Sequence, residues 1–295
     1  MHPSRTATAA IALLACATMH LEAAEEKLVF RGSVAVKPVV DAAAKAFTAA
    51  HPEIGISTSG STSDVSLQAV LAGEAQLGAL VKDLSPEQRR QNPELRTIPI
   101  AIDGLVLVVS AKNPVAGLSR KQIGDIFTGT IATWQAVGGA DTAIVPVVRM
   151  KSFASSAFFG SSFDLEYQEV GEGADKRMQH RAKGASAWGA ARALITDDHP
   201  KGLAKVLTMP DAITYAPYGI AQAMISKGAG LKLLALDGTM PTPATIQAGT
   251  YPVTRPCLLL LKGEPQGALL AFVSFLTSSD GQKVVESCDF VPLAK

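Results

Sequence analysis

The chain lacks an excess of charge of either sign. Its 27 Lys and Arg side chains stand against 26 Asp and Glu, so the formal net charge is +1. Proteins that bind nucleic-acid phosphates usually carry a concentrated basic field, and this balance therefore argues against a nucleic-acid partner. With 295 residues, of which 47% are hydrophobic, the chain is long enough for one large domain or two medium ones.

Residues that commonly carry catalysis are scarce. There are five histidines, and His51, His180 and His199 show no spacing typical of metal ligands. The sequence contains no Gly-x-Ser-x-Gly elbow, and the stretch Gly60–Ser63 lacks the lysine of a phosphate-binding P-loop. We therefore expect no catalytic residues, no metal site and no cofactor.

Long apolar segments are missing as well, since none approaches the ~20 uninterrupted apolar residues of a membrane-spanning helix. The N-terminus instead has the pattern of a secretory signal. Arg5 precedes the short apolar run Ala7–Thr18, and Ala23 and Ala24 offer the small residues that a signal peptidase requires. We predict a signal peptide over residues 1–24 and a soluble, exported protein.

Cysteine is rare, with three residues in the chain. The stretch Leu13–Cys16 resembles a lipoprotein cleavage box, so a lipid-anchored N-terminus at Cys16 is an alternative to soluble export. Cys257 and Cys288 remain after processing, and an even pair in an oxidising compartment suggests a disulfide. It would close a loop of about 30 residues and contribute roughly 3–4 kcal/mol. Two buried free thiols are the alternative.

Strand and helix patterns alternate along the first part of the chain. Lys27–Phe30, Ile54–Ile56 and Leu77–Val81 are short strand candidates. Apolar residues from Val36 to Phe47 follow helical spacing, and Gly60–Ser63 opens a second helix. This order indicates a parallel sheet covered by helices, which is an α/β fold.

Later segments give further predictions. Ile98–Ile102 and Leu105–Ser110 are predicted as two buried strands separated by a turn at Asp103-Gly104. Capping boxes at Ser85/Gln88 and Ser119/Gln122 predict two helix starts. Residues 165–185 are polar, and we predict them as helical.

The stretch Ile126–Gly139 is the most informative in the chain. It combines a helix end, a glycine-containing turn, a tryptophan expected to be buried and a Gly-Gly turn. Further motifs stand in a fixed order around it, at Ala101–Gly104, Ala212–Tyr215, Tyr251–Pro256, Ser278–Gln282 and Phe290–Leu293. The whole set resembles the phosphate-binding proteins that serve bacterial phosphate ABC importers, and the resemblance covers nearly the whole mature chain.

This resemblance implies a two-lobed type II periplasmic-binding-protein fold, in which each lobe is a mostly parallel sheet flanked by helices. We expect residues 25–110 and 250–295 in the first lobe and residues 111–249 in the second. The implied function is capture of phosphate or a related oxyanion in the cleft between the lobes, for delivery to an ABC permease. The implied location is the periplasm, and we expect a monomer.

The same resemblance implies three side-chain ligands. Ser61 matches a hydroxyl donor at a helix start, although it could simply cap that helix. Arg149 matches the cleft arginine and stands at the carboxyl end of a strand, where such folds bind ligands. A surface ion pair is its alternative role. Asp103 could accept the hydrogen of monohydrogen phosphate, which sulfate cannot supply, or could merely form a turn before glycine.

Three loops complete the predicted site, and all three depart from the family pattern. Ser33 is followed by Val34 instead of a threonine, so only backbone N–H groups could donate there. Leu80-Val81 replaces a polar pair. After Arg149, Ser155 keeps a hydroxyl while Phe153 places a ring where a small donor is usual. An alternative therefore remains, in which the protein keeps the binding-protein fold but no longer binds phosphate. It would then serve as an exported interaction or sensor protein, or bind another ligand.

Overall fold

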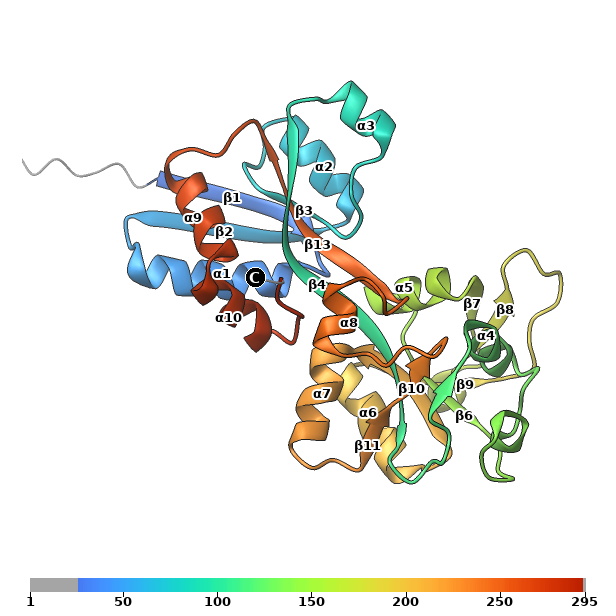
Figure 1. The fold of residues 1–295 in the computed structure, drawn as a ribbon. Coiled ribbons are helices and arrows are strands. Elements are labelled where there is room, and N and C mark those ends of the chain that lie inside the picture. The colour runs from blue at the N-terminus through green and yellow to red at the C-terminus, as the bar shows by residue number, and fades with distance from the viewer. Residues whose placement is uncertain (1–25, 294–295) are drawn as a thin grey trace, which may run out of the picture.

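The computed structural model describes residues 26–293. The predicted signal peptide and the lipoprotein box at Cys16 lie outside the described residues. Among residues 26–293, every helix falls short of the length and hydropathy that crossing a bilayer would require. Figure 1 shows two α/β units joined by extended strands that run from one unit into the other.

Within residues 26–293, five strands build the first unit. β1 (Glu26–Ser33) pairs in parallel with β2 (Ile54–Ser61), and Phe30 of β1 bridges in parallel to Leu77 beside β3 (Gly78–Leu80). β3 lies antiparallel to β13 (Thr254–Lys262), which lies antiparallel to β4 (Leu95–Ser110). The helices of this unit are α1 (Lys37–Ala50), α2 (Ser63–Leu71), α3 (Pro86–Gln91), α9 (Gly267–Thr277) and α10 (Ser279–Ser287).

The second unit continues from the far end of β4. β10 (Ala212–Pro217) lies antiparallel to β4 and parallel to β6 (Val145–Arg149), which pairs in parallel with β9 (Ala193–Thr196). β8 (Arg177–Ala182) and β7 (Leu165–Val170) extend the sheet, β11 (Leu231–Leu233) pairs with β4, and β5 (Gly117–Leu118) pairs with β12 (Ala235–Leu236). The helices are α4 (Arg120–Thr128), α5 (Ala154–Ser162), α6 (His199–Thr208), α7 (Tyr218–Ser226) and α8 (Pro243–Gln247), with short 3-10 turns at Trp134–Val137 and Gly173–Asp175.

One prediction is wrong at the junction of the two units. Asp103-Gly104 does not interrupt a pair of strands, because β4 runs unbroken from Leu95 to Ser110. The two residues continue the ladder with β13, opposite Arg255 and Thr254. β4 and β13 therefore carry the chain between the units side by side, as Figure 1 shows.

The helix predicted over residues 165–185 is also wrong. The segment forms the antiparallel pair of β7 and β8. In β8 the buried side chains are Met178 and His180, two residues apart, which is the spacing of one face of a strand. The polar side chains between them hid this period of two from the sequence.

Several local predictions are confirmed. Both capping boxes form, with Ser85 and Ser119 each accepting a hydrogen bond from the amide three residues later. In the Ile126–Gly139 stretch, Gly129 ends α4 at a φ of 86°, a left-handed value that favours glycine. Trp134 is buried, and its Nε1 donates to the carbonyl of Asp211 at 2.9 Å. This stretch is scaffold of the second unit.

The apolar side chains divide with the two units. A first core gathers buried residues of β1, α1, β13, α9 and α10, and a small cluster under α2 lies on the other side of β13. Alternate leucines of β13 face these two clusters, as expected for a strand buried on both faces. A second core contains buried residues from Leu105 to Val253 and Val291.

The disulfide prediction is corrected by the structure, which has both Cys257 and Cys288 as free thiols. Cys257 is fully buried in the first core, where burial raises the pKa of its thiol. The Cys288 thiol donates to the Pro38 carbonyl at 3.7 Å instead. The two sulfurs therefore have separate neighbours.

Candidate ligand-binding cleft

A cavity of about 700 Å³ lies where the two units face each other. The first unit contributes residues 33–35 at the end of β1, residues 61–63 where β2 ends and α2 begins, and residues 81–83 after β3. The second unit contributes one side of α5, and the start of β13 at residues 254–256 completes the lining. Three of its segments follow the carboxyl ends of strands, which is where α/β folds bind ligands.

Hydrogen-bond donors gather on the wall formed by the first unit. Ser33, Ser61 and Ser63 all line it. Thr62 is the N-cap of α2, and its hydroxyl accepts from the Val65 amide, so Ser61 is not the cap of this helix. The first-turn amides of α2 point their partial positive charge toward this end of the helix, an arrangement that favours anions.

Val34 lines the cleft in a different way from the one predicted. Its backbone amide donates to the Ser61 carbonyl at 3.0 Å and is therefore not available to a ligand. Its side chain is 56% exposed and packs over Gly60, where an added Cβ would meet Val34 at 2.8 Å. The residue thus contributes an apolar surface in place of a donor.

The opposite wall belongs to α5. Ala154, Ala157, Phe158 and Ser161 line the cavity, and their spacing places them on one side of the helix. Val81, the residue after β3, flanks the same space. The aromatic ring in the cleft is therefore Phe158, whereas Phe153 is the N-cap of α5 and lies outside the lining.

Arg255 sits at the base of the cleft, on the strand that passes between the units. Its Nη2 and Nε bind Oδ2 of Asp103 at 2.7 and 2.9 Å, and only 13% of its side chain is exposed. Its guanidinium stacks over the Phe158 ring with a distance of 4.4 Å to the centroid. Asp103 therefore holds the arginine of the cleft. Its own side chain is buried and does not line the cavity, which argues against the predicted role as acceptor of a ligand hydrogen.

Lys82 supplies the other positive charge of the lining. The neighbouring Asp83 is paired with Arg89 at 2.5 Å and also accepts from Thr97, and these contacts lower the pKa of its carboxyl despite the opposing effect of desolvation. Among the described residues, Lys82 has no ion-pair partner. Since Arg255 and Asp83 are each balanced by a neighbour, the lining carries one uncompensated positive charge.

Arg149 does not reach this cleft. Its side chain is fully buried in the second unit, where Nη1 donates to the Asp198 carbonyl and Nη2 donates to Thr214 Oγ1 at 3.0 Å. The guanidinium lies against α6, and a Cβ added at Gly202 would collide with Nη2. The buried position of Arg149 contradicts both the predicted role as a ligand of the anion and the alternative of a surface ion pair.

The surroundings of Arg149 are polar, but within the described part of the chain no carboxylate forms an ion pair with it. Burial lowers the pKa of its guanidinium to about 10, opposed by the more distant charges of Asp198 and Asp197. Its Nε, the Ser155 hydroxyl and His199 Nδ1 are buried without a hydrogen-bond partner among the described residues. Ser155 therefore also lies away from the cleft, on the inner side of α5.

The structure thus brings Ser33, Val34 and Ser61 together and leaves Arg149 and Ser155 apart from them. Arg255 and Phe158 were not predicted as site residues, whereas Lys82 was expected either to supply a replacement charge or to be an ordinary solvated lysine, and it lines the cavity. Arg255 belongs to the motif Tyr251–Pro256, so a basic residue inside that motif was the signal available for it.

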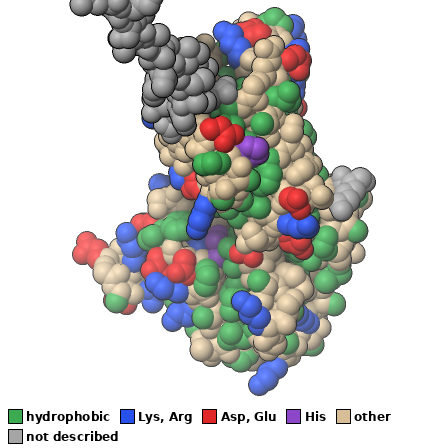
Figure 2. Space-filling model, turned by 90° about the vertical axis from the view of Figure 1, so that its left-hand side faces the viewer, with side chains coloured by type: hydrophobic (Ala, Val, Ile, Leu, Met, Phe, Trp, Pro, Cys, Tyr) green, Lys and Arg blue, Asp and Glu red, His purple; other side chains and the backbone are tan. Residues whose placement is uncertain are grey.

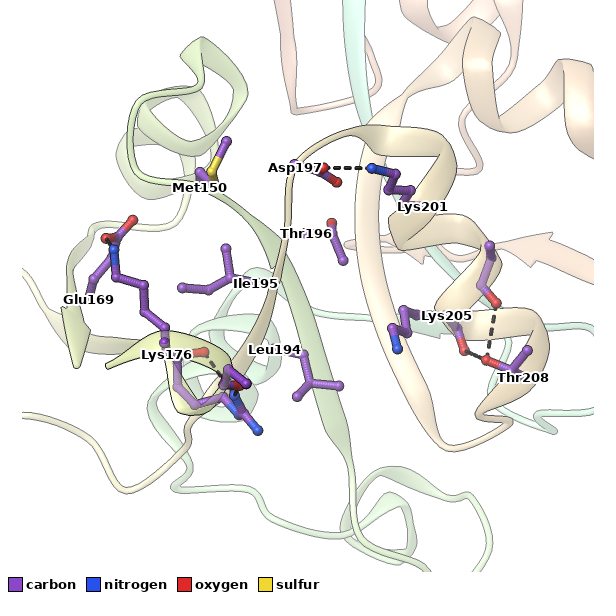
Figure 3. A pocket seen from close by; sticks show the side chains of 14 residues that line it. Met150, Glu169, Lys176, Leu194, Ile195, Thr196, Asp197, Lys201, Lys205 and Thr208 are labelled. Carbon is purple, nitrogen blue, oxygen red and sulfur yellow. Dashed lines mark hydrogen bonds and ion pairs between the residues drawn. The ribbon is translucent and has the colours of Figure 1, made fainter. Parts of the chain in front are cut away.

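A second groove of about 800 Å³ lies within the second unit, between residues 173–177, β9 and α6 (Figure 3). Two of its lysines are paired with neighbouring carboxylates, Lys176 with Glu169 at 2.7 Å and Lys201 with Asp197 at 2.6 Å. Basic and acidic side chains are likewise interspersed over the face shown in Figure 2. None of the predicted ligand residues lines this groove, so the cleft between the units is the stronger candidate.

Comparison with known proteins identifies the family. A family model described as the PBP superfamily domain matches residues 18–280. The chain belongs to the PBP superfamily. This membership agrees with the arrangement of two α/β units about a cleft, and it confirms the predicted periplasmic-binding-protein fold. The expectation of mostly parallel sheets is wrong, because β10 and β13 both lie antiparallel to β4 and β7 lies antiparallel to β8.

Individual relatives of this PBP-superfamily chain are receptors for phosphate. It is 27% identical over 276 residues to the phosphate-binding protein PstS of Bacillus subtilis, covering 92% of this chain and 82% of that one. The crystal structure of an ABC-type phosphate transport receptor from Vibrio cholerae matches with a TM-score of 0.73 at 24% identity, over 90% and 99% of the two chains. A putative phosphate ABC transporter substrate-binding protein from Clostridium perfringens, solved with bound phosphate, matches with a TM-score of 0.64 at 25% identity, over 91% and 100%.

Proposed function

We propose that this protein is an exported solute-binding receptor that captures phosphate or a related oxyanion and delivers it to an ABC permease. The observation that carries the proposal is the convergence of the α2 N-terminus, Lys82 and Arg255 on one cavity. Helix-terminal amides, hydroxyls and cations are the donors that an oxyanion requires. The phosphate receptors among its relatives support the same ligand class.

The two cores are proposed to be two lobes that move about the crossing strands. The residues that belong to each core favour boundaries near Asp103-Gly104 and Val253-Thr254. The second lobe is then a few residues longer at each end than the predicted range 111–249. Closure would bring α5 toward the α2 N-terminus around the ligand, a hinge motion common among such receptors. We further propose that the protein acts as a monomeric, non-enzymatic receptor in the periplasm, by analogy with its relatives.

Isothermal titration calorimetry of the purified protein with phosphate, arsenate and sulfate tests this function. The proposal predicts saturable heat with phosphate or arsenate and a matching upward shift of the melting temperature. An absence of both signals for all three anions at millimolar concentration would reject oxyanion capture.

A second candidate is a receptor-like protein that no longer binds phosphate. The apolar side chains of Val34, Val81 and Phe158 favour it. Each lies in the cleft where a hydrogen-bond donor would be needed to bind an anion. Phosphate released from the purified protein by mild denaturation separates the two candidates. Stoichiometric phosphate would rule out the second, and its absence together with no calorimetric response would support it.

A further inference from the structure

The two walls of the cleft differ in polarity. Donors are concentrated on the first lobe, at Ser33, Ser61 and Ser63 with the first turn of α2. The facing side of α5 presents two alanine methyl groups and the ring of Phe158, and its one hydroxyl in the lining, Ser161, donates to the Phe158 carbonyl at 3.0 Å. An inorganic phosphate ion carries oxygens in all directions, and an oxygen turned toward α5 would lose its water without gaining a donor.

Apolar surface also surrounds the polar wall itself. Val34 projects its side chain from the β1–α1 turn, and Val81 follows β3 beside Lys82. The cavity volume of about 700 Å³ lies within the range usual for organic ligands. The shape and polarity therefore suit a ligand with one anionic end and one apolar end.

The charges agree with a single anionic group. Arg255 is matched by Asp103 and Asp83 by Arg89, which leaves Lys82 as the uncompensated charge among the described lining residues. One cation and a helix N-terminus can hold one phosphoryl or phosphonyl group. A second anionic group would have to lie against α5, where no cation lines the cavity apart from Arg255.

We propose that the cleft prefers a phosphoryl or phosphonyl anion that carries an apolar substituent, with the anion at the α2 N-terminus and the substituent against Ala154, Ala157 and Phe158. This inference rests on the proposed function and narrows its ligand class. Burying an aromatic substituent against this wall should tighten binding by about 10-fold or more.

The test is calorimetry of the full protein with inorganic phosphate and with phenylphosphonate. The proposal predicts that phenylphosphonate binds at least about 10-fold more tightly than inorganic phosphate. Inorganic phosphate binding equally or more tightly would overturn the inference while leaving oxyanion capture intact. If neither compound binds, nor sulfate nor arsenate, the proposed function itself fails.

Two variants locate the preference. Val34→Thr introduces a hydroxyl at an exposed position and is expected to strengthen the binding of inorganic phosphate about 10-fold. The ratio of the affinities for phenylphosphonate and inorganic phosphate should then become smaller. Phe158→Ala should weaken phenylphosphonate more than inorganic phosphate. Phe153→Ala is the matched control, because Phe153 is a half-buried ring at the start of the same helix but outside the lining. Equal effects of the two phenylalanine changes on the preference would contradict the placement of the substituent.

Discussion

The two cores of the molecule differ in what they enclose besides hydrocarbon. Few polar side chains are buried near the first core, and one of them, Ser66, accepts a hydrogen bond from the Ala79 amide at 2.8 Å. The second core encloses the fully buried Arg149 and also His180, Thr196 and Thr214. The first lobe therefore resembles an ordinary apolar core, whereas the second contains ionisable groups that must be held without water.

This difference explains why one arginine serves the cleft and another does not. Arg149 is retained by the second core through Thr214 and the Asp198 carbonyl, and the missing side chain of Gly202 makes room for it. Arg255 lies between the cores, where Asp103 balances its charge and the cleft remains within reach. The packing around each arginine therefore decides whether its guanidinium lies in a core or beside the cleft.

The largest expected effect concerns the buried arginine. Arg149→Ala should lower the free energy of unfolding by about 3–5 kcal/mol, because it leaves a cavity and two acceptors without their donor. Arg149→Met fills most of that volume without a buried charge, and its stability should remain within about 1.5 kcal/mol of the parent protein. Chemical denaturation of both variants measures the difference. Equal, small losses would show that Arg149 is not part of the core.

The next effect is a dependence of stability on pH. Burial lowers the pKa of both His180 and His199 to about 4, with the charge of Arg149 adding to the effect at His199. Histidine in the unfolded chain titrates near pH 6.5, so the unfolded state takes up protons first as the pH falls. Stability should be complete above about pH 6.5 and should decline toward pH 4, by up to about 3 kcal/mol per histidine.

Melting temperatures between pH 8 and pH 4 test this dependence. His180→Phe should reduce the decline, because His180 already packs among the rings of Phe127, Phe159 and Tyr167 and a phenylalanine cannot be protonated. If the melting temperature of that variant depends on pH as it does in the parent protein, His180 does not cause the acid sensitivity.

A smaller effect is expected at the glycine beneath Arg149. Gly202→Ala would bring a methyl group into the guanidinium and should cost about 1–3 kcal/mol of stability. The same change in the Arg149→Ala background should cost less, since the obstructing group is absent. A double-mutant cycle by chemical denaturation measures this coupling, and additive losses would argue against the contact.

The smallest effect is expected at the cysteines of the first core. Because Cys257 and Cys288 are free thiols, a reducing agent should shift the melting temperature by less than about 1 °C. A disulfide closing this loop would contribute roughly 3–4 kcal/mol, which corresponds to a shift of several degrees. A large decrease in the melting temperature on reduction would instead show that the predicted disulfide forms.

Much of the fold could be predicted because its signals are local. Capping boxes, the glycine after α4 and alternating strands and helices each depend on a few neighbouring residues. Ser33 and Ser61 were placed in the cleft by the resemblance to phosphate-binding proteins, and they are the last residues of β1 and β2. The hairpin of β7 and β8 was missed because its intermediate polar positions conceal the alternation.

The site residues that were missed depend on contacts between distant parts of the chain. The pairing of Arg255 with Asp103 joins residues 152 positions apart and follows from the register of β4 and β13. The direction of the Arg149 side chain depends on α6, which begins 50 residues later and leaves space at Gly202. No local pattern around either arginine records these neighbours.

The division of roles between the two arginines is tested most directly by calorimetry with the tighter of phosphate and phenylphosphonate. One variant is Arg149→Met, and the other is the double change Asp103→Asn and Arg255→Gln, which removes the cleft pair without leaving a buried charge alone. We predict that Arg149→Met binds with nearly the affinity of the parent protein and that the double variant binds about 10- to 100-fold more weakly. Loss of binding in Arg149→Met with retained binding in the double variant would contradict the account.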